Sequence, residues 1–188
     1  MSLPLYLSGR LVSIRDFTPA DGEALALFAD DEAMFEFMKF RMDASWLERV
    51  VPLFQRPPEL GAARRDFSLA AVAEDRFIGL AMIGEVTEEK HAEFGWYLRS
   101  DAWGRGYATD ATILLLTFGF HELGLVRMFA TTDPENSASI RVLTKAGLTN
   151  QGLTDPVQTW RGLRPRVLFT IEPEQWKKVR QLDLPTHK

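Results

Sequence analysis

Two glycines between a strand-like run and a long apolar run constrain the fold of this chain more than any other feature. The stretch Trp103-Gly104-Arg105-Gly106-Tyr107-Ala108-Thr109-Asp110-Ala111 follows Phe94-Gly95-Trp96-Tyr97-Leu98 and opens an apolar segment, residues 111–123. Glycine adopts backbone conformations that other residues avoid, so the chain can turn tightly there. The pattern therefore predicts a strand, a tight turn and a helix in close succession.

The start of that helix is predicted to bind an anion. Its first amides have no partner within the helix and lie at the positive end of the helix dipole, which suits a pyrophosphate. Arg105 adds a charge at the rim. A dinucleotide fingerprint would need a third glycine where Thr109 stands, and a P-loop would need Gly-Lys-Ser/Thr. On these residues alone, a turn whose glycines serve packing remains the alternative.

Composition indicates one globular domain over residues 1–188, in the cytoplasm. A hydrophobic content of 46% and a charged content of 26% are typical of soluble proteins. There is no apolar run long enough for a membrane span, no signal-peptide pattern at the start, and no cysteine for a disulfide. The net charge of -4 argues against a nucleic-acid partner and is compatible with a cationic amine.

Periodicity predicts a chain of the α/β (α+β) class, with a mixed and mostly antiparallel sheet flanked by helices. The predicted strands cover residues 11–15, 67–73, 77–85, 92–98, 126–132, 148–157 and 166–171, with a loop through Arg161-Gly162. The predicted helices start at Thr18, cover 34–38, 44–54, 111–123 and 136–147, and follow Pro173. The helix over 111–123 is apolar almost all round, so it is expected to be buried.

The glycine turn and its surroundings resemble the acetyl-CoA-binding motif of the GNAT acetyltransferases. The motif residues are Glu93-Phe94-Gly95-Trp96-Tyr97-Leu98 and the turn from Trp103 to Thr109. Further along, Asn136-Ser137-Ala138-Ser139 is similar to the Asn-x-x-Ser helix of the RimJ/RimL-type ribosomal-protein N-terminal acetyltransferases. The resemblance covers roughly residues 11–171, the expected core, with both motifs in the expected order and spacing.

The resemblance implies a GNAT fold in which two splayed strands hold acetyl-CoA as co-substrate, with no metal. Acetyl would pass directly to a primary amine in a ternary complex. The acceptor would be a protein N-terminus, or a small amine such as an antibiotic or a polyamine. Gly95 would mark a bulge in its strand. The residues implied to contact acetyl-CoA are Trp96, Tyr97, Leu98, Trp103, Gly104, Arg105, Gly106, Tyr107, Ala108, Thr109, Asn136 and Ser139.

Glu93 and Ser139 are the candidate catalytic residues. Glu93 lies on the same strand face as Gly95 and Tyr97, where a carboxylate could take the proton of the acceptor amine. The alternative is a strand-end carboxylate in solvent or paired with arginine, and Glu85 is then the next candidate base. The resemblance places Ser139 near the thioester sulfur; the alternative is that both polar residues serve only to cap the helix, with Asn136 as the N-cap.

Two departures from the family pattern keep a second function open. Trp103 stands where the family loop often begins with Gln or Arg, and Leu143 stands where many members carry a Tyr that protonates the thiolate. The missing Tyr favours a non-catalytic CoA-binding sensor or partner module. The oligomeric state stays open, with a homodimer among the candidates.

Two groups of polar residues complete the set of candidates. Asp30, Asp31, Glu32 and Glu36 form an acidic run, which is typical of a solvated face. In the family this part of the chain walls the substrate, where such a run would attract a cationic amine. His91 and His121 are isolated, so no metal site is expected from them.

Overall fold

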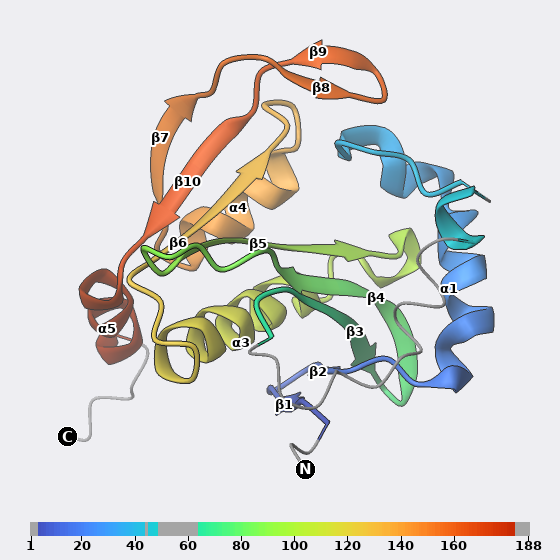
Figure 1. Ribbon diagram of the computed structural model, residues 1–188, viewed down its shortest axis with the longest axis horizontal. Helices are drawn as coiled ribbons and strands as arrows, with labels where there is room; N and C mark the ends of the chain where they lie inside the picture. Colours follow the sequence, from blue (N-terminus) through green and yellow to red (C-terminus); the bar gives the residue numbers. More distant parts are fainter. Residues whose placement is uncertain (1–3, 44, 49–63, 183–188) are drawn as a thin grey trace.

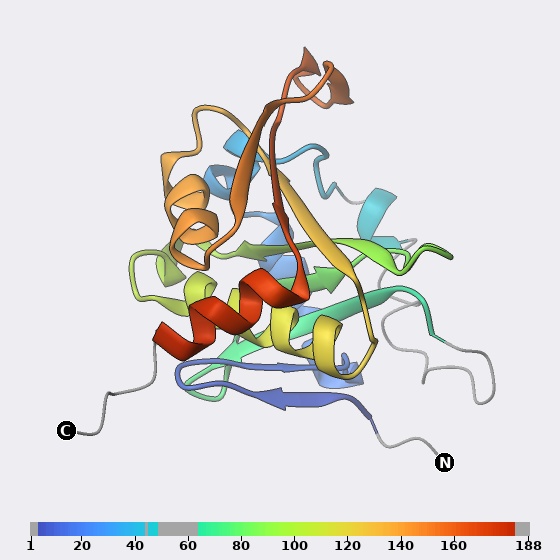
Figure 2. The same cartoon turned by 90° about the vertical axis from the view of Figure 1, so that its left-hand side faces the viewer.

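A single eight-stranded sheet forms the centre of the protein (Figures 1 and 2). The structure is a computed structural model and describes residues 4–43, 45–48 and 64–182. The strands follow the order β1-β2-β3-β4-β5-β6-β10-β7, and all neighbours are antiparallel except β5 and β6. The predicted fold class, a mixed and mostly antiparallel sheet flanked by helices, is confirmed.

The chain places its elements in the following order. The strands of the sheet are β1 (Tyr6–Ser8), β2 (Ser13–Arg15), β3 (Phe67–Ala73), β4 (Arg76–Ile83), β5 (His91–Leu98), β6 (Arg127–Thr132), β7 (Thr149–Leu153) and β10 (Val167–Ile171). A separate hairpin consists of β8 (Val157–Thr159) and β9 (Gly162–Arg164). The helices are η1 (Pro19–Asp21), α1 (Gly22–Ala29), η2 (Glu32–Phe37), η3 (Ser100–Ala102), α3 (Tyr107–His121), α4 (Ser137–Lys145) and α5 (Pro173–Leu182).

Each face of the sheet carries its own hydrophobic core. One core contains Leu115 and Leu116 of α3, Leu143 of α4 and Trp176 of α5. The other core contains residues of α1 and η2 packed on Ala70, Phe77 and Leu80. Because β3 and β4 are covered on both faces, they read as nearly continuous apolar runs in the sequence.

The only parallel pair of the sheet, β5 with β6, opens into a gap. The pairing runs from His91↔Arg127 to Glu93↔Phe129 and stops there, while β5 continues to Leu98 and β6 to Thr132. Figure 2 shows β6, β10 and β7 rising away from the rest of the sheet. The splayed strands that the family resemblance implies are therefore present.

The gap forms without the bulge expected at Gly95, and that expectation is wrong. The β4–β5 register is continuous from Gly79↔Leu98 to Ile83↔Phe94, whereas a shift lies between Ala71 and Val72 in the β3–β4 pair. A Cβ built on Gly95 would meet nothing closer than Met82 at 3.8 Å, but one built on Gly79 would lie 2.1 Å from the Tyr97 carbonyl oxygen. Gly79 is thus the glycine that close packing requires in this part of the sheet.

Several predicted boundaries also differ from the structure. The helix expected over 111–123 is α3, Tyr107–His121, and begins four residues earlier because Gly106 serves as its N-cap in a left-handed conformation. The strand expected over 148–157 ends at Leu153, and the predicted loop at Arg161-Gly162 is the turn of the β8–β9 hairpin. β1 was not predicted, since three residues are too few to show alternation.

The helix predicted over residues 44–54 lies only partly within the described residues. Residues 45–48 are helical, and the rest of the helix expected over 44–54 lies outside the described part of the chain, as does the loop expected at 57–61. None of the helices within the described ranges is long and apolar enough to cross a membrane.

Candidate active site

A cavity of about 660 Å³ passes through the gap between β5 and β6. On one face of the sheet its walls are the glycine turn, the first turn of α3 and the side of α4; we call this the α3–α4 side. On the other face they are Met34, Phe37, Met38, Lys39 and Phe40, in and just after η2, with Glu93 and Arg166; we call this the η2 side. Residues of both hydrophobic cores therefore line the cavity.

The α3–α4 side presents backbone rather than side chains at the glycine turn. Gly104 and Gly106 have φ values of 75° and 84°, a conformation that favours glycine. A Cβ on Gly104 would meet nothing within 4 Å, so this face of the turn is open. The amide of Asp110 donates to Gly106 at 3.1 Å, which leaves the amides of Tyr107, Ala108 and Thr109 without a carbonyl one turn earlier in the helix. This geometry suits a pyrophosphate.

The free edge of β5 offers a second row of backbone groups. The amide of Gly84 donates to Glu93 and that of Arg99 donates to Ile78, so odd-numbered residues of β5 bond toward β4. Because backbone groups alternate sides along an antiparallel strand, those of Trp96 and Leu98 face the gap and those of Tyr97 do not. The Trp103 indole donates to the Leu98 carbonyl at 2.8 Å, which leaves the Leu98 amide as a donor toward the gap.

The start of α4 supplies the polar residues Asn136 and Ser139. The Asn136 side chain accepts a hydrogen bond from the Ser139 amide at 2.9 Å, so it caps the helix as expected. Both residues line the cavity, as do Val142 and Leu143 of the same helix. Leu143 is 1% exposed and belongs to the core, which explains why an apolar residue stands there.

Some residues of the glycine turn that are predicted to contact acetyl-CoA do not extend their side chains into the cavity. Arg105 is exposed and is not a lining residue. The Tyr107 side chain is buried and donates to Glu74 at 3.1 Å, so it lines the cavity at the helix start while its hydroxyl points elsewhere. Trp103, Gly104, Gly106, Ala108 and Thr109 all line the cavity.

Asp110 is a positioning residue that the sequence did not reveal. Its Oδ2 accepts hydrogen bonds from the amides of Leu11 at 2.6 Å and Val12 at 2.9 Å. The carboxylate therefore fastens the β1–β2 turn to the first turn of α3, directly beside the glycines. An acidic residue in a first helical turn was the available signal, but its partners lie almost one hundred residues away in the chain.

On the η2 side, Glu93 lies between a cation and a hydroxyl. Lys39 Nζ donates to Glu93 Oε1 at 2.8 Å, and the Thr131 hydroxyl donates to the same oxygen at 2.9 Å. Among the described residues, Oε2 has no hydrogen-bond partner, and Glu93 lines the cavity. The paired alternative was expected with an arginine; the structure shows a lysine.

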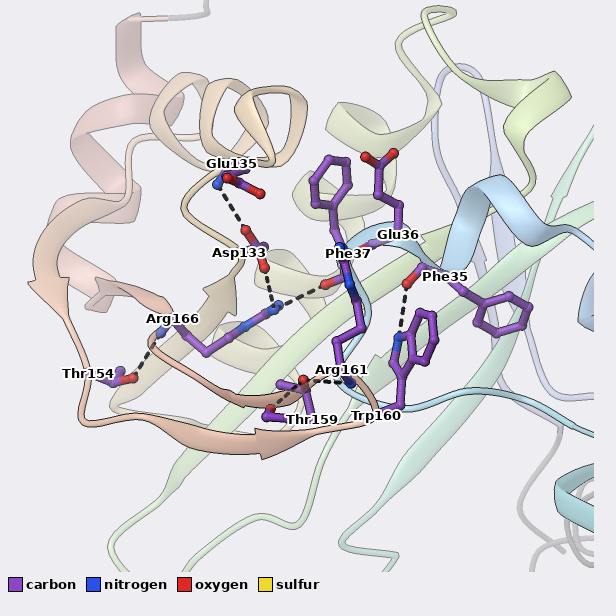
Figure 3. Close-up of polar contacts among 11 residues, drawn as sticks. Phe35, Glu36, Phe37, Asp133, Glu135, Thr154, Thr159, Trp160, Arg161 and Arg166 are labelled. Carbon is purple, nitrogen blue, oxygen red and sulfur yellow. Dashed lines mark hydrogen bonds and ion pairs between the residues drawn. The ribbon is translucent and has the colours of Figure 1, made fainter.

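Arg166 is the most buried charge on the η2 side. Its Nη1 donates to the Phe37 carbonyl at 3.0 Å and lies 3.7 Å from Asp133 Oδ2, and both side chains are 6% exposed (Figure 3). Burial lowers the pKa of the guanidinium, and the neighbouring Asp133, Tyr97 and Glu93 oppose this shift. Its Nε is buried without a partner among the described residues. No motif marks this arginine in the sequence.

The turn of the β8–β9 hairpin is hydrogen-bonded to η2, which forms part of the η2 side. Trp160 Nε1 donates to the Phe35 carbonyl at 3.1 Å, and Arg161 Nη1 donates to that of Glu36 at 2.9 Å (Figure 3). With Arg166 on Phe37, three consecutive carbonyls at the end of η2 are bonded by donors from the C-terminal part of the chain. The shape of the η2 side therefore depends on contacts between segments far apart in the sequence.

Tyr97 lies on the η2 side of the cavity, on the same strand face as Glu93. Its ring meets Phe40 edge-on with centroids 5.7 Å apart. Burial raises the pKa of the Tyr97 phenol to about 12; the negative charge of Glu93 adds to the rise, and Arg166 opposes it. At neutral pH the phenol is therefore a neutral hydrogen-bond donor.

The acidic run is not part of this site. Asp31 accepts a hydrogen bond from the Ser100 amide at 2.6 Å, Glu32 pairs with Arg41, and no residue of the run lines the cavity. Within the described ranges of the chain, no three His, Cys, Asp or Glu side chains gather into a candidate metal site.

Comparison with known proteins agrees with this geometry. The model of the Acetyltransferase (GNAT) domain matches residues 11–149. The uncharacterized N-acetyltransferase YnaD of Bacillus subtilis is 28% identical over 148 residues, which cover 79% of this chain and 85% of YnaD. The chain therefore belongs to the GNAT acetyltransferases and is an acetyl-CoA-dependent N-acetyltransferase.

Solved structures show the same fold. An acetyltransferase of the GNAT family from Bacillus anthracis superposes with a TM-score of 0.75 at 23% identity, over 90% of this chain and 99% of that one. Mycobacterium smegmatis RimJ in complex with CoA-disulfide superposes with a TM-score of 0.77 at 23% identity, over 92% of this chain and 88% of that one.

Proposed function

We propose that the enzyme acetylates the N-terminal amine of a peptide or protein, as a RimJ/RimL-type enzyme does. The observation that carries this proposal is the charge of the cavity wall. On the η2 side, where the acceptor would enter, Glu93 is the only carboxylate among the described lining residues, whereas Lys39 and Arg166 are cations. A polyamine would need several carboxylates in its pocket, but a peptide N-terminus brings one amine followed by carbonyl groups that accept hydrogen bonds.

Acetyl-CoA would lie along the α3–α4 side. Its pyrophosphate would bind the amides of Tyr107, Ala108 and Thr109 over the open face of Gly104. Its pantetheine arm would bond the backbone of Trp96 and Leu98 in the strand gap, with Asn136 and Ser139 across from it. The support is that every one of these groups lines one continuous cavity.

Glu93 would act as the general base. The amine of the acceptor would approach the η2 side, give its proton to Glu93 and attack the thioester carbonyl carbon. The Leu98 amide, which faces the gap, would donate to the oxyanion of the tetrahedral intermediate. As the carbon–sulfur bond breaks, the thiolate would take a proton from Ser139 or from water, and the surplus proton of the tetrahedral nitrogen would replace the one given up.

A thiol-release assay with a matched set of acceptors tests this assignment. A peptide with a free N-terminus and no lysine should release CoA thiol from acetyl-CoA, and the same peptide with a formylated N-terminus should not. Spermidine is expected to be a poor acceptor. A preference for spermidine over the free peptide would disprove the peptide assignment. Tight CoA binding without thiol release for any amine would instead support the non-catalytic module that Leu143 left open.

A further inference from the structure

We propose that Lys39 is itself an acetylation site: its ε-amine accepts the acetyl group from acetyl-CoA bound in the same molecule. The inference rests on the proposed function, because it requires Glu93 as the base. Its structural support is that a primary amine of the chain already occupies the position that the acceptor amine must reach. Lys39 Nζ lies 2.8 Å from Glu93 Oε1, and both residues line the cavity.

The main chain around Lys39 is held so that its side chain points to Glu93. The Trp160 amide donates to the Lys39 carbonyl at 3.0 Å, next to the bonds that Trp160, Arg161 and Arg166 make to the end of η2 (Figure 3). Phe40, the next residue, packs on Tyr97 and on Trp46. A fixed backbone reduces the volume that the ammonium can search, which raises its effective concentration at the base.

The ion pair between Lys39 and Glu93 contributes little to the stability of the fold. The side chains of Lys39 and Glu93 are 32% and 33% exposed. An ion pair with this exposure contributes about 1 kcal/mol or less to stability. The lysine can therefore leave the carboxylate at little cost, and the carboxylate remains open to solvent and to substrate.

The reaction balances without any further reactant. The Lys39 ammonium gives one proton to Glu93, and the lone pair of the neutral amine forms a bond to the thioester carbonyl carbon. The carbon–sulfur bond then breaks, and the thiolate leaves as CoA with a proton from the tetrahedral nitrogen. The products are acetyl-Lys39, CoA and one proton released from Glu93 to solvent.

Acetylation of Lys39 would remove a competitor from the site. The acetylated side chain has no positive charge and cannot form an ion pair with Glu93. Glu93 then keeps Thr131 as its donor, and an external amine no longer has to displace a cation of the chain. Self-acetylation would thus act as a one-time activation by the co-substrate.

The test is to incubate the full-length protein with acetyl-CoA in the absence of any acceptor, and to locate the modification by peptide mass spectrometry. Lys90, which is exposed and does not line the cavity, serves as the internal control for chemical acetylation. Lys39 should gain one acetyl group about a hundredfold faster than Lys90, the lower end of what a positioned base contributes. The rate should not change on dilution of the protein.

Two variants sharpen the result. Lys39→Arg keeps a cation beside Glu93 and should abolish the fast modification, and Glu93→Gln should slow it at Lys39 but not at Lys90. Equal rates at Lys39 and Lys90, or a rate at Lys39 that falls with dilution, would overturn the proposal. So would an unmodified Lys39 in a preparation that acetylates the free peptide. A modified Lys39 in a preparation that acetylates no external amine would keep this inference and reject the peptide acceptor.

Discussion

The α3–α4 side of the cavity consists mostly of backbone groups from two short segments, whereas the η2 side consists of side chains from segments spread over the chain. Residues 103–109 and 136–145 supply the first side together with the free edge of β5, and Asp110 binds the β1–β2 turn next to it. The second side brings together Lys39, Glu93, Thr131 and Arg166. In our proposal the backbone groups of the first side bind acetyl-CoA, and the side chains of the second side meet the acceptor. The comparison predicts that substitutions on the two sides change different parameters.

Replacing Glu93, the proposed base, should have the largest effect. Glu93→Gln is expected to keep the fold and the affinity for CoA, and to lower turnover by about a hundredfold to ten-thousandfold because no positioned group takes the amine proton. Part of the loss should be recovered at high pH, where the free amine needs no base. Steady-state kinetics of thiol release from pH 6 to 10 would measure this.

The matched control for that change is Glu85→Gln. Glu85 is exposed near the end of the neighbouring strand and does not line the cavity, so this variant should retain its turnover. Normal turnover of Glu93→Gln at neutral pH would remove Glu93 from the mechanism and make the η2 side a binding surface only.

Loss of Arg166 should affect stability and the acceptor more than the cofactor. Arg166→Met removes the donor to Phe37 and leaves Asp133, which is 4% exposed, without its cation. Breaking a buried pair in this way costs about 3 kcal/mol. Urea denaturation should show this loss, and kinetics should show a higher KM for the amine.

The matched control for Arg166→Met is the Arg161→Met variant. Arg161 also donates to an η2 carbonyl, but its side chain is exposed, so its loss should cost about 1 kcal/mol or less. Equal losses of stability in the two variants would mean that the buried charge of Arg166 contributes no more than one hydrogen bond.

The glycine turn should control CoA affinity with a smaller effect. Gly104 and Gly124 have similar φ values, 75° and 64°, and a Cβ on either would meet nothing within 4 Å. Alanine at either position should therefore lower stability by about 1 kcal/mol through backbone strain. Because Gly104 alone of the two lines the cavity, Gly104→Ala should also weaken CoA binding about tenfold, or 1.4 kcal/mol.

Calorimetric titration with CoA, together with thermal melts, would separate the two contributions. Equal CoA affinities of the Gly104→Ala and Gly124→Ala variants would show that the turn serves packing and that the anion binds elsewhere.

The smallest effect at neutral pH concerns Tyr97, on the η2 side. Its phenol has a pKa raised to about 12, so the unfolded chain loses this proton before the folded protein does. The stabilisation is complete below the ordinary pKa of 10 and is lost as the pH rises toward 12. Phenolate absorbance of the wild type minus that of Tyr97→Phe should show this late titration. A difference spectrum that titrates near 10 would place the Tyr97 ring in solvent.

Sequence patterns were most informative where structure depends on neighbouring residues. The glycines of the turn, the Asn136 cap and the strand with Glu93 follow from local backbone requirements, and the structure places them around one cavity. The same local reasoning failed at Gly95, because a glycine in a strand indicates close packing without saying which neighbour approaches. The close approach is at Gly79, against the carbonyl of Tyr97.

What the sequence determined by itself is the class of fold, the family and the glycine turn that lines the α3–α4 side, since these depend on periodicity and on short motifs. The tertiary structure alone decided the η2 side. Lys39 meets Glu93, and Arg166 meets Phe37 and Asp133, across separations that no local pattern encodes. Such contacts arise because a carbonyl at a helix end or a buried carboxylate needs a partner, and the folded chain supplies whichever donor it brings within reach.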